Sequence, residues 1–266
     1  MENNISNNIS KSEIDVLTDN RYNIFVYDEI ASTNDALKQL AVGGAKDNTV
    51  IIANKQTKGK GRHGRSFFSP DDTGIYFSIL LKRDFSPEKA MMLTPTAAVC
   101  VAKAIEKHVS QPVKIKWVND IYIDNKKVCG ILSESSFSFD NTKTDFNIIG
   151  IGINVSKPKQ DFPEEIRTKA GVLFNNEKTP DNIKNRLIAD ILNEFSLLID
   201  SFDNEYIYIN YVKRSWLDNK SVIADTGGET FEGVVVGIDK SMQLLVRKSD
   251  GNIVAMNSGE VNIKIL

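Results

Sequence analysis

A short basic stretch rich in glycine carries the densest potential chemistry in this sequence. Residues 58–65 read Lys-Gly-Lys-Gly-Arg-His-Gly-Arg and place three glycines and four fixed cations in eight positions. Glycines let backbone amides approach a ligand closely, and arginine offers planar donors that suit carboxylate or phosphate oxygens. The stretch therefore predicts an anion-binding loop, although a flexible surface loop or an RNA-contacting patch would have the same composition. It is not a P-loop, because the GxxxxGK(S/T) pattern is absent.

Four further segments could contribute to a ligand site. Residues 116–120 read Lys-Trp-Val-Asn-Asp at a predicted strand end, and residues 127–132 (Lys-Val-Cys-Gly-Ile-Leu) form the following strand. Residues 150–154 read Gly-Ile-Gly-Ile-Asn, and glycines inside a strand often mark the close approach of a ligand or another backbone. Residues 32–34 read Ser-Thr-Asn before a predicted helix. Each segment also has a simpler interpretation: a plain turn, solvent-facing lysines, a β-bulge, or a helix cap.

Taken together and in order, these segments resemble the bacterial biotin–protein ligase family. The motifs are S-T-N, Q-x-x-G-(K/R)-G-R-x-G-R, K-W-x-N-D, K-x-x-G-I-L and G-x-G-I-N, and the match covers about residues 27–155. A chance occurrence of five motifs in this order and spacing would be rare. The resemblance implies an enzyme that uses ATP to convert biotin to biotinyl-5′-AMP. It also implies transfer of biotin to a specific lysine of a biotin carboxyl carrier protein or domain.

The resemblance implies a role for each matching residue. The residues expected to contact biotin are Ser32, Thr33, Asn34, Gln56, Lys60, Gly61, Arg62, Lys127, Gly130 and Gly150. The residues expected on the nucleotide side are Gly59, Arg65, Asn119, Asn154 and Lys264. Lys127, Arg62 and Asp120 are expected to carry the catalysis, with ATP as a substrate. Asp120 is also expected to help hold Mg²⁺.

The chain departs from the family pattern at three places. Lys60 stands where arginine is commoner, which retains the charge but loses the bidentate donor. Val118 replaces the usual proline. About 20 polar residues precede residue 22, too few for the winged-helix domain of some family members, so DNA binding is not expected.

The rest of the sequence must fold into elements that position these residues. Residues 22–217 mix β-type and helical patterns and predict an α/β (α+β) domain with a mixed sheet, which the resemblance identifies as the catalytic fold shared with lipoate ligases. Apolar residues at helical spacing over 183–202 predict one long amphipathic helix. Short β-type runs over 218–266 predict a small antiparallel barrel, SH3-like by resemblance. Residues 1–21 are expected to form a polar, weakly packed tail.

Composition excludes several classes of protein. The formal net charge is −2, so no overall field would recruit nucleic acid or an anionic membrane. The two cysteines and two histidines show no metal-binding or redox spacing. No apolar run approaches the roughly 18 residues that a membrane span needs, and the first ten residues lack a signal sequence. The expected location is therefore the cytoplasm.

Two alternatives compete with the biotin ligase. A lipoate or octanoate ligase or transferase would have the same catalytic fold, and fold alone does not decide function. The Gly-Lys-Gly-Arg-His-Gly-Arg loop and the barrel-like tail favour biotin over lipoate. A non-catalytic nucleic-acid-binding module could use the basic loop and the small barrel, but the near-neutral total charge argues against it.

Overall fold

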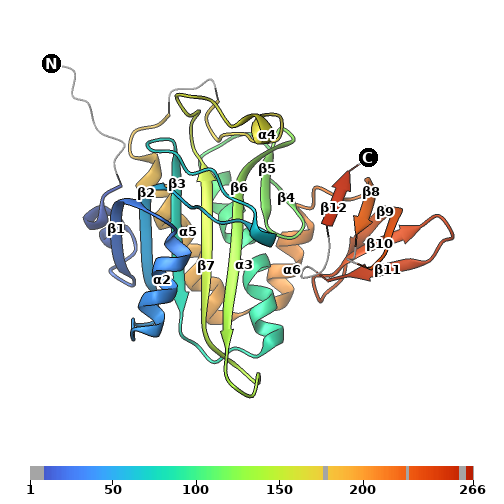
Figure 1. Ribbon diagram of the computed structural model, residues 1–266, viewed down its shortest axis with the longest axis horizontal. Helices are drawn as coiled ribbons and strands as arrows, with labels where there is room; N and C mark the ends of the chain where they lie inside the picture. The colour runs from blue at the N-terminus through green and yellow to red at the C-terminus, as the bar shows by residue number, and fades with distance from the viewer. Residues whose placement is uncertain (1–8, 176–178, 226–227, 258–261, 266) are drawn as a thin grey trace.

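Two β-sheets organise the chain (Figure 1). The computed structural model describes residues 9–175, 179–225 and 228–257, and the backbone of residues 262–265. A seven-stranded mixed sheet has the order β1-β2-β3-β7-β6-β5-β4, and a five-stranded antiparallel sheet has the order β11-β10-β9-β8-β12. The predicted mixed α/β fold with a small β-rich C-terminal part is therefore confirmed.

The elements have the following bounds. The helices are α1 (Lys11–Leu17), α2 (Thr33–Val42), α3 (Pro87–Glu106), α4 (Glu164–Arg167), α5 (Ile183–Ser201), α6 (Asn204–Val212) and the 3-10 turn η1 (Arg62–Gly64). The strands of the large sheet are β1 (Asn23–Ile30), β2 (Thr49–Gln56), β3 (Gly74–Leu81), β4 (Lys114–Lys116), β5 (Asp120–Ile123), β6 (Lys126–Phe137) and β7 (Thr144–Asn154). The strands of the small sheet are β8 (Ser221–Asp225), β9 (Thr230–Ile238), β10 (Leu244–Lys248), β11 (Ile253–Met256) and β12 (Asn262–Ile265).

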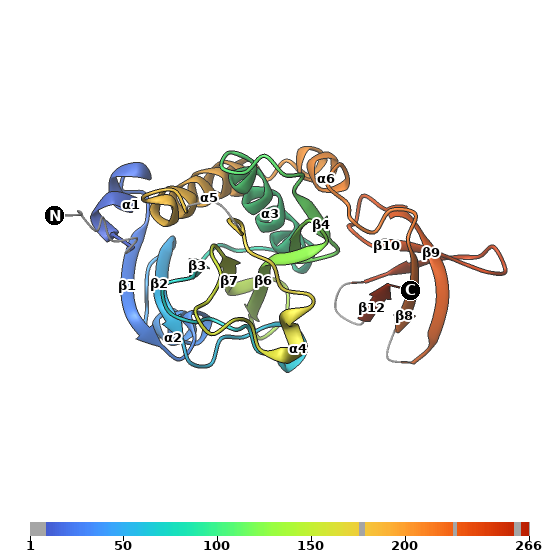
Figure 2. The ribbon, with the colours of Figure 1, turned by 90° about the horizontal axis from the view of Figure 1, so that it is seen from above.

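The large sheet is covered on both faces, with α3 and α5 on one side and α2 on the other (Figure 2). Residues 50–53 of β2 are apolar at four successive positions, and the packing on the two faces shows why. Val50 and Ile52 belong to the core beneath α3 and α5, whereas Ile51 packs with Leu37 of α2. Successive side chains of a strand point to opposite faces, so a strand covered on both faces must be apolar at every position.

A two-residue turn joins β5 and β6 into a hairpin. Asp124 and Asn125 both adopt positive φ angles, 49° and 59°, and they connect the two antiparallel strands. Asn and Asp tolerate this left-handed conformation, which matches the twist of the flanking strands. The turn places Lys127 close to Asp120 across the hairpin.

The structure corrects the prediction for residues 1–21. Residues 11–17 form α1, which Ser10 caps by accepting a hydrogen bond from the amide of Glu13 at 3.4 Å. Ile14 is fully buried where α1 packs against α5, and the Ser10 amide donates to Asn185 Oδ1 at 2.9 Å. Polar composition suggested a loose tail, but one buried isoleucine and a good cap dock a short helix. Residues 1–8 lie outside the described residues.

The small sheet is joined to the rest of the protein by a buried hydrogen bond to Trp117 and a part-buried one to Tyr208 of α6. The indole nitrogen of Trp117 donates to the carbonyl of Met242 at 2.9 Å, and the Tyr208 hydroxyl donates to the carbonyl of Ile238 at 3.0 Å. One hydrophobic core runs from the large sheet into the small one and includes both Ile121 and Met242. The predicted boundary near residue 218 falls between α6 and β8. None of the helices in the described ranges combines the length and apolar character of a membrane span.

Candidate active site

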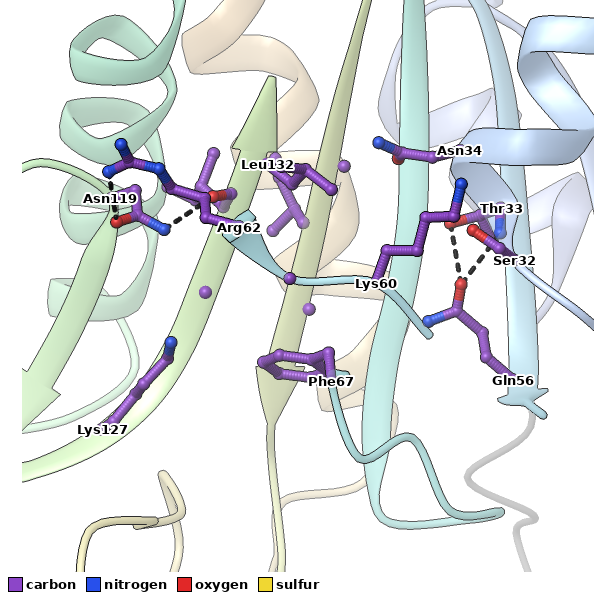
Figure 3. A pocket seen from close by; sticks show the side chains of 16 residues that line it. Ser32, Thr33, Asn34, Gln56, Lys60, Arg62, Phe67, Asn119, Lys127 and Leu132 are labelled. Carbon is purple, nitrogen blue, oxygen red and sulfur yellow. Dashed lines mark hydrogen bonds between the residues drawn. The ribbon is translucent and has the colours of Figure 1, made fainter. Parts of the chain in front are cut away.

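A pocket lies on the α2 side of the large sheet, beneath the basic glycine-rich loop. It is lined by Ser32, Thr33, Asn34, Gln56, Lys60, Gly61, Arg62, Phe67, Asn119, Lys127, Gly130, Ile131, Leu132, Gly150, Ile151 and Gly152 (Figure 3). Every residue that the sequence predicts to contact biotin is in this lining. The fold thus gathers side chains that are up to about 120 positions apart into one cavity.

One end of the pocket is neutral and hydrogen-bonded. The amide and hydroxyl of Thr33 donate to Gln56 Oε1 at 2.8 and 3.1 Å, and Gln56 Nε2 donates to Ser69 Oγ at 3.0 Å. Ser32 caps α2 by accepting from the amide of Asp35 at 3.4 Å. These residues meet because β1 and β2 run parallel, which brings the end of β2 next to the start of α2. We call this the neutral end.

Two residues that the sequence did not single out lie beside the neutral end: the neutral Ser78 and the carboxylate Glu134. The Ser78 hydroxyl on β3 lies 2.7 Å from Thr33 Oγ1 and 2.6 Å from Asn34 Oδ1. Asn34 Nδ2 in turn donates to Glu134 Oε2 on β6 at 2.6 Å. Ser78 is fully buried in an otherwise apolar strand, and a buried hydroxyl needs a partner. A single serine in an apolar strand was therefore the sequence signal that could have identified Ser78 as a site residue.

The floor of the pocket is formed by glycines of β7, which expose their backbone to the pocket. Alternation along β7 points Gly150 and Gly152 toward the α2 side, since Ile149, Ile151 and Ile153 belong to the opposite core. A Cβ on Gly150 would lie 2.2 Å from Asn34 Oδ1, so a side chain there would displace Asn34. A Cβ on Gly152 would lie 2.5 Å from the Phe67 ring.

Phe67 lies directly on this floor, between Lys127 and Gln56 (Figure 3). Gly152 on β7 and Gly130 on β6 are opposite each other, and the ring contacts both positions. Phe67 follows the basic loop in sequence, and its amide donates to the carbonyl of Gly59 at 2.9 Å. The sequence analysis missed Phe67, because the pattern of glycines and cations drew attention to the loop that precedes it.

The other end of the pocket is charged. Lys127 Nζ lies 2.7 Å from Asp120 Oδ1. Arg62 Nη1 donates to Asn119 Oδ1 at 3.4 Å, and Asn119 Nδ2 donates to the carbonyl of Ile131 at 2.9 Å. Asn119 thus connects Arg62 to β6. Burial lowers the pKa of Arg62, while nearby Asp120 acts in the opposite direction. We call this the cationic end.

A further lysine lies behind the cationic end. Lys116 is half-buried, and its ammonium lies 5.8 Å from the ring centroids of both Tyr122 and Trp216. Burial lowers the pKa of Lys116, and Asp120 opposes that effect while Lys127 adds to it. The local excess of positive charge is greater than the net charge of the chain suggests.

Among the described side chains, four predicted site residues do not line the pocket, and Lys264 is a separate case. Gly59 is buried at the base of the loop, Arg65 is exposed, and Asp120 lies behind Lys127. Asn154 Nδ2 donates to the carbonyl of Gly171 at 3.0 Å. The backbone of Lys264 pairs with Ile223 in the small sheet, and its side chain lies outside what the structure describes. Their expected roles stay predictions.

The donor set suits magnesium that arrives with a nucleotide. Within the described residues, no group of three or more His, Cys, Asp or Glu could hold a metal ion. Asp120 Oδ1 is buried and faces the ammonium of Lys127 without a well-aligned hydrogen bond. Mg²⁺ commonly binds one or two carboxylates together with substrate phosphates and water. Asp120 therefore fits one carboxylate ligand of Mg·ATP rather than a cage made by the protein.

Comparison with known proteins decides the family. Residues 26–154 match the biotin/lipoate A/B protein ligase family, and residues 219–263 match the biotin protein ligase C-terminal domain. The chain is 32% identical over 235 residues to the bifunctional ligase/repressor BirA of Bacillus subtilis, covering 86% of this chain and 70% of that protein. The chain belongs to the biotin protein ligase family.

Other biotin protein ligases match along nearly the whole chain. The biotin–[acetyl-CoA-carboxylase] ligase of Mycobacterium tuberculosis is 28% identical over 242 residues, with 88% of this chain and 86% of that protein covered. The solved structure of the biotin protein ligase from Aquifex aeolicus in complex with biotin and ATP superimposes with a TM-score of 0.76 at 28% identity, covering 92% of this chain and 99% of that one. The ligase fold therefore includes the small C-terminal sheet.

Proposed function

We propose that this chain is an ATP-dependent biotin–protein ligase that forms biotinyl-5′-AMP and transfers biotin to a lysine of a biotin carboxyl carrier protein or domain. The observation that carries the proposal is a single pocket with a neutral end and a cationic end. The biotin ligases among the relatives, and the Aquifex structure with biotin and ATP, support these substrates and favour biotin over lipoate. Since ATP is a cytoplasmic metabolite, we also propose a cytoplasmic location.

The neutral end suits the ring system of biotin. A ureido group is uncharged and offers both N–H donors and a carbonyl acceptor. Thr33 and Gln56 supply hydroxyl and amide groups that can both donate and accept, and Ser32 adds a hydroxyl. Leu132, the Phe67 ring and the glycine floor form an apolar stretch between the two ends, which suits the aliphatic chain of biotin. The carboxylate would then lie near Arg62 and Lys127.

The first step joins two anions. One oxygen of the biotin carboxylate attacks the α-phosphorus of ATP, and the bond to the pyrophosphate group breaks. A carboxylic acid with a pKa near 4 to 5 is already ionised at neutral pH, so this step needs no general base. Two like charges about 4 Å apart repel by about 1 kcal/mol in water but by about 4 kcal/mol at an effective dielectric of 20. Lys127 and Arg62 would offset that repulsion.

The second step is attack of the acceptor lysine on the mixed anhydride, which releases AMP. That lysine is mostly protonated at neutral pH and must lose a proton first. Asp120, the carboxylate paired with Lys127, is our candidate to accept it. Until attack occurs, the anhydride must be kept from water. The loop that carries Arg62 closes back on itself through the Gly61 amide, which donates to the carbonyl of Arg65 at 2.7 Å.

A direct assay tests the proposal. The chain is mixed with Mg·ATP, biotin and a biotin carboxyl carrier domain, and the carrier is weighed by intact mass spectrometry. We expect one biotinyl group per carrier, with none when ATP is omitted or when the acceptor lysine is replaced by arginine. Lipoate in place of biotin should leave the carrier unmodified. An unchanged carrier mass with biotin, or equal transfer of lipoate, would overturn the proposal.

A further inference from the structure

The backbone around Lys127 is held by a segment distant in sequence. Strand β7 ends at Asn154, so it does not reach the first residues of β6, and residues 168–171 take its place there. The amide of Lys127 donates to the carbonyl of Lys169 at 2.8 Å. The amide of Gly171 donates to the carbonyl of Lys127 at 2.8 Å. Both backbone polar groups of Lys127 are therefore bonded to this segment.

The 168–171 segment is itself anchored on both sides. The amide of Ala170 donates to the carbonyl of Ile166 in α4 at 2.7 Å. The carbonyl of Gly171 accepts from Asn154 Nδ2 at 3.0 Å, and the amide of Leu173 donates to the carbonyl of Asn154 at 3.0 Å. Leu173 is buried. The segment is thus a fixed support and not a loose loop lying against β6.

Gly171 sets how closely the segment approaches β6. A Cβ at this position would lie 2.5 Å from Lys126 Cβ and 3.4 Å from Val128 Cγ1. Cβ atoms do not approach each other to 2.5 Å, so any side chain at 171 must push the segment away from the strand. The backbone of Gly171 is bonded to Lys127, and that displacement would be transmitted there.

The pairing of Lys127 with the neighbouring strand β5 is less regular. Ile121 pairs with Cys129 and Tyr122 with Lys127, so Val128 is an extra residue in β6. Such a β-bulge locally disrupts the ladder and changes the direction in which side chains point. The hydrogen bonds from the 168–171 segment, on the other side of β6, compensate for this disruption.

We propose that the 168–171 segment positions Lys127, with Gly171 as the residue that sets its distance from β6. The segment fixes the backbone of Lys127. The Lys127 side chain lines the pocket, and its ammonium lies 2.7 Å from Asp120. The proposal rests on the proposed function, in which Lys127 offsets the charge of the reactants. Gly171 is a positioning residue in this proposal and acts through Lys127.

The first test is the Gly171→Ala variant in a biotin adenylation assay. We expect kcat to fall on the order of tenfold, less than when Lys127 itself is removed and within the roughly hundredfold that a displacement of about 1 Å can cost, and KM for biotin to stay within about twofold. Gly228→Ala is the matched control, because a Cβ there has no atom within 4 Å. An unchanged kcat in Gly171→Ala, or a loss confined to biotin KM, would overturn the proposal.

A double-mutant cycle separates positioning from general damage. If Gly171 acts through Lys127, Gly171→Ala should cause no further loss of kcat in a Lys127→Ala background. Losses that multiply independently would show that Gly171 acts by another route.

A further test does not depend on enzyme activity. Lysines are labelled with an amine-reactive reagent, and peptide mass spectrometry measures the labelling rate at each position. Loosening of the Lys127–Asp120 pair in Gly171→Ala should raise the labelling rate of Lys127 relative to Lys60. An unchanged ratio contradicts the proposal. A wild-type chain that fails to adenylate biotin would refute the proposed function instead, and the labelling ratio would still test the contact.

Discussion

The two ends of the pocket are built in opposite ways. At the neutral end, Thr33, Asn34 and Ser78 are buried and hydrogen-bonded to one another or to adjacent side chains. At the cationic end, Arg62 and Lys127 are only partly buried. Arg62 lies on a loop, and Lys127 lies on a strand with a bulge. Under the proposed function, the neutral end would recognise the ligand through short-range hydrogen bonds. The cationic end would activate it through charges, whose effect grows as water is excluded.

The largest effect should come from removing a charge at the cationic end. Lys127→Ala is expected to lose at least about 2 kcal/mol of transition-state stabilisation, because a preorganised group that meets developing charge contributes on that scale. This corresponds to roughly a thirtyfold fall in the rate of adenylation. Single-turnover formation of biotinyl-5′-AMP measures it, and biotin affinity should change little. Adenylation at the wild-type rate would remove Lys127 from the mechanism.

Removing Arg62 should affect retention of the intermediate. A charge-assisted hydrogen bond is worth about 1.5 kcal/mol or more, so Arg62→Gly is expected to release the adenylate roughly tenfold faster. The free anhydride would then label lysines of nearby proteins without selectivity. Mass spectrometry of a mixture of carrier and bystander proteins measures this. Unchanged acceptor selectivity, with no adenylate free in solution, would count against this role.

A change at the neutral end should be smaller and independent of salt. Ser78→Ala removes the hydroxyl that lies between Thr33 and Asn34, and one buried hydrogen bond is worth about 1 kcal/mol. Biotin binding is expected to weaken about fivefold, by the same factor at low and high salt, because no charge is lost. Calorimetric titration at two salt concentrations measures it. The exposed Ser201→Ala serves as control, and strong salt dependence in Ser78→Ala would break the comparison.

The smallest effect is expected on the surface of the loop. Lys60 forms an ion pair with Asp35, and each side chain keeps 42% of its surface exposed. The hydrogen bond to Asp35 raises the pKa of Lys60, but such exposed pairs are worth less than about 1 kcal/mol. Asp35→Asn should speed adenylate release by no more than about fivefold at low salt, and the difference should vanish at high salt.

A matched control for that variant is available on the sheet edge. Glu29→Gln removes another exposed ion pair, with Lys55 at 2.6 Å, which lies outside the pocket lining. This variant should leave adenylate release unchanged at every salt concentration. A large, salt-independent effect of Asp35→Asn would show that Lys60 is held more firmly than an exposed pair allows.

Much of the site could be predicted from the sequence because its residues lie in short, recognisable motifs. Gly150 and Lys127 each belong to a pattern with fixed spacing. Ser78 and Glu134 do not, and they enter the site only through strand register, which pairs Ser78 with Gly150. Periodicity predicts that a strand exists but not which strand lies beside it. Strand pairing between distant segments is a tertiary property, so these two residues required the structure.

The error at the N-terminus has a related cause. Composition classed the first residues as a loose tail, yet Ile14 fits a site on α5 that no local pattern reveals. Asn154, whose expected place on the nucleotide side stays a prediction, has an amide group that bonds the carbonyl of Gly171, a partner that the motif does not indicate. In both cases the partner lies far along the chain. Local sequence shows which side chains can form bonds, whereas the fold determines the partner.

The bond between the Trp117 indole and the Met242 carbonyl has a practical consequence for anyone who wishes to shorten this protein. Trp117 is two residues from Asn119, and both sheets share one core. Deleting the last fifty or so residues would uncover an apolar patch and leave a buried donor unsatisfied, at a cost of about 1–3 kcal/mol for the donor alone. The truncated protein should aggregate, and heating the intact chain should melt both sheets in one cooperative transition.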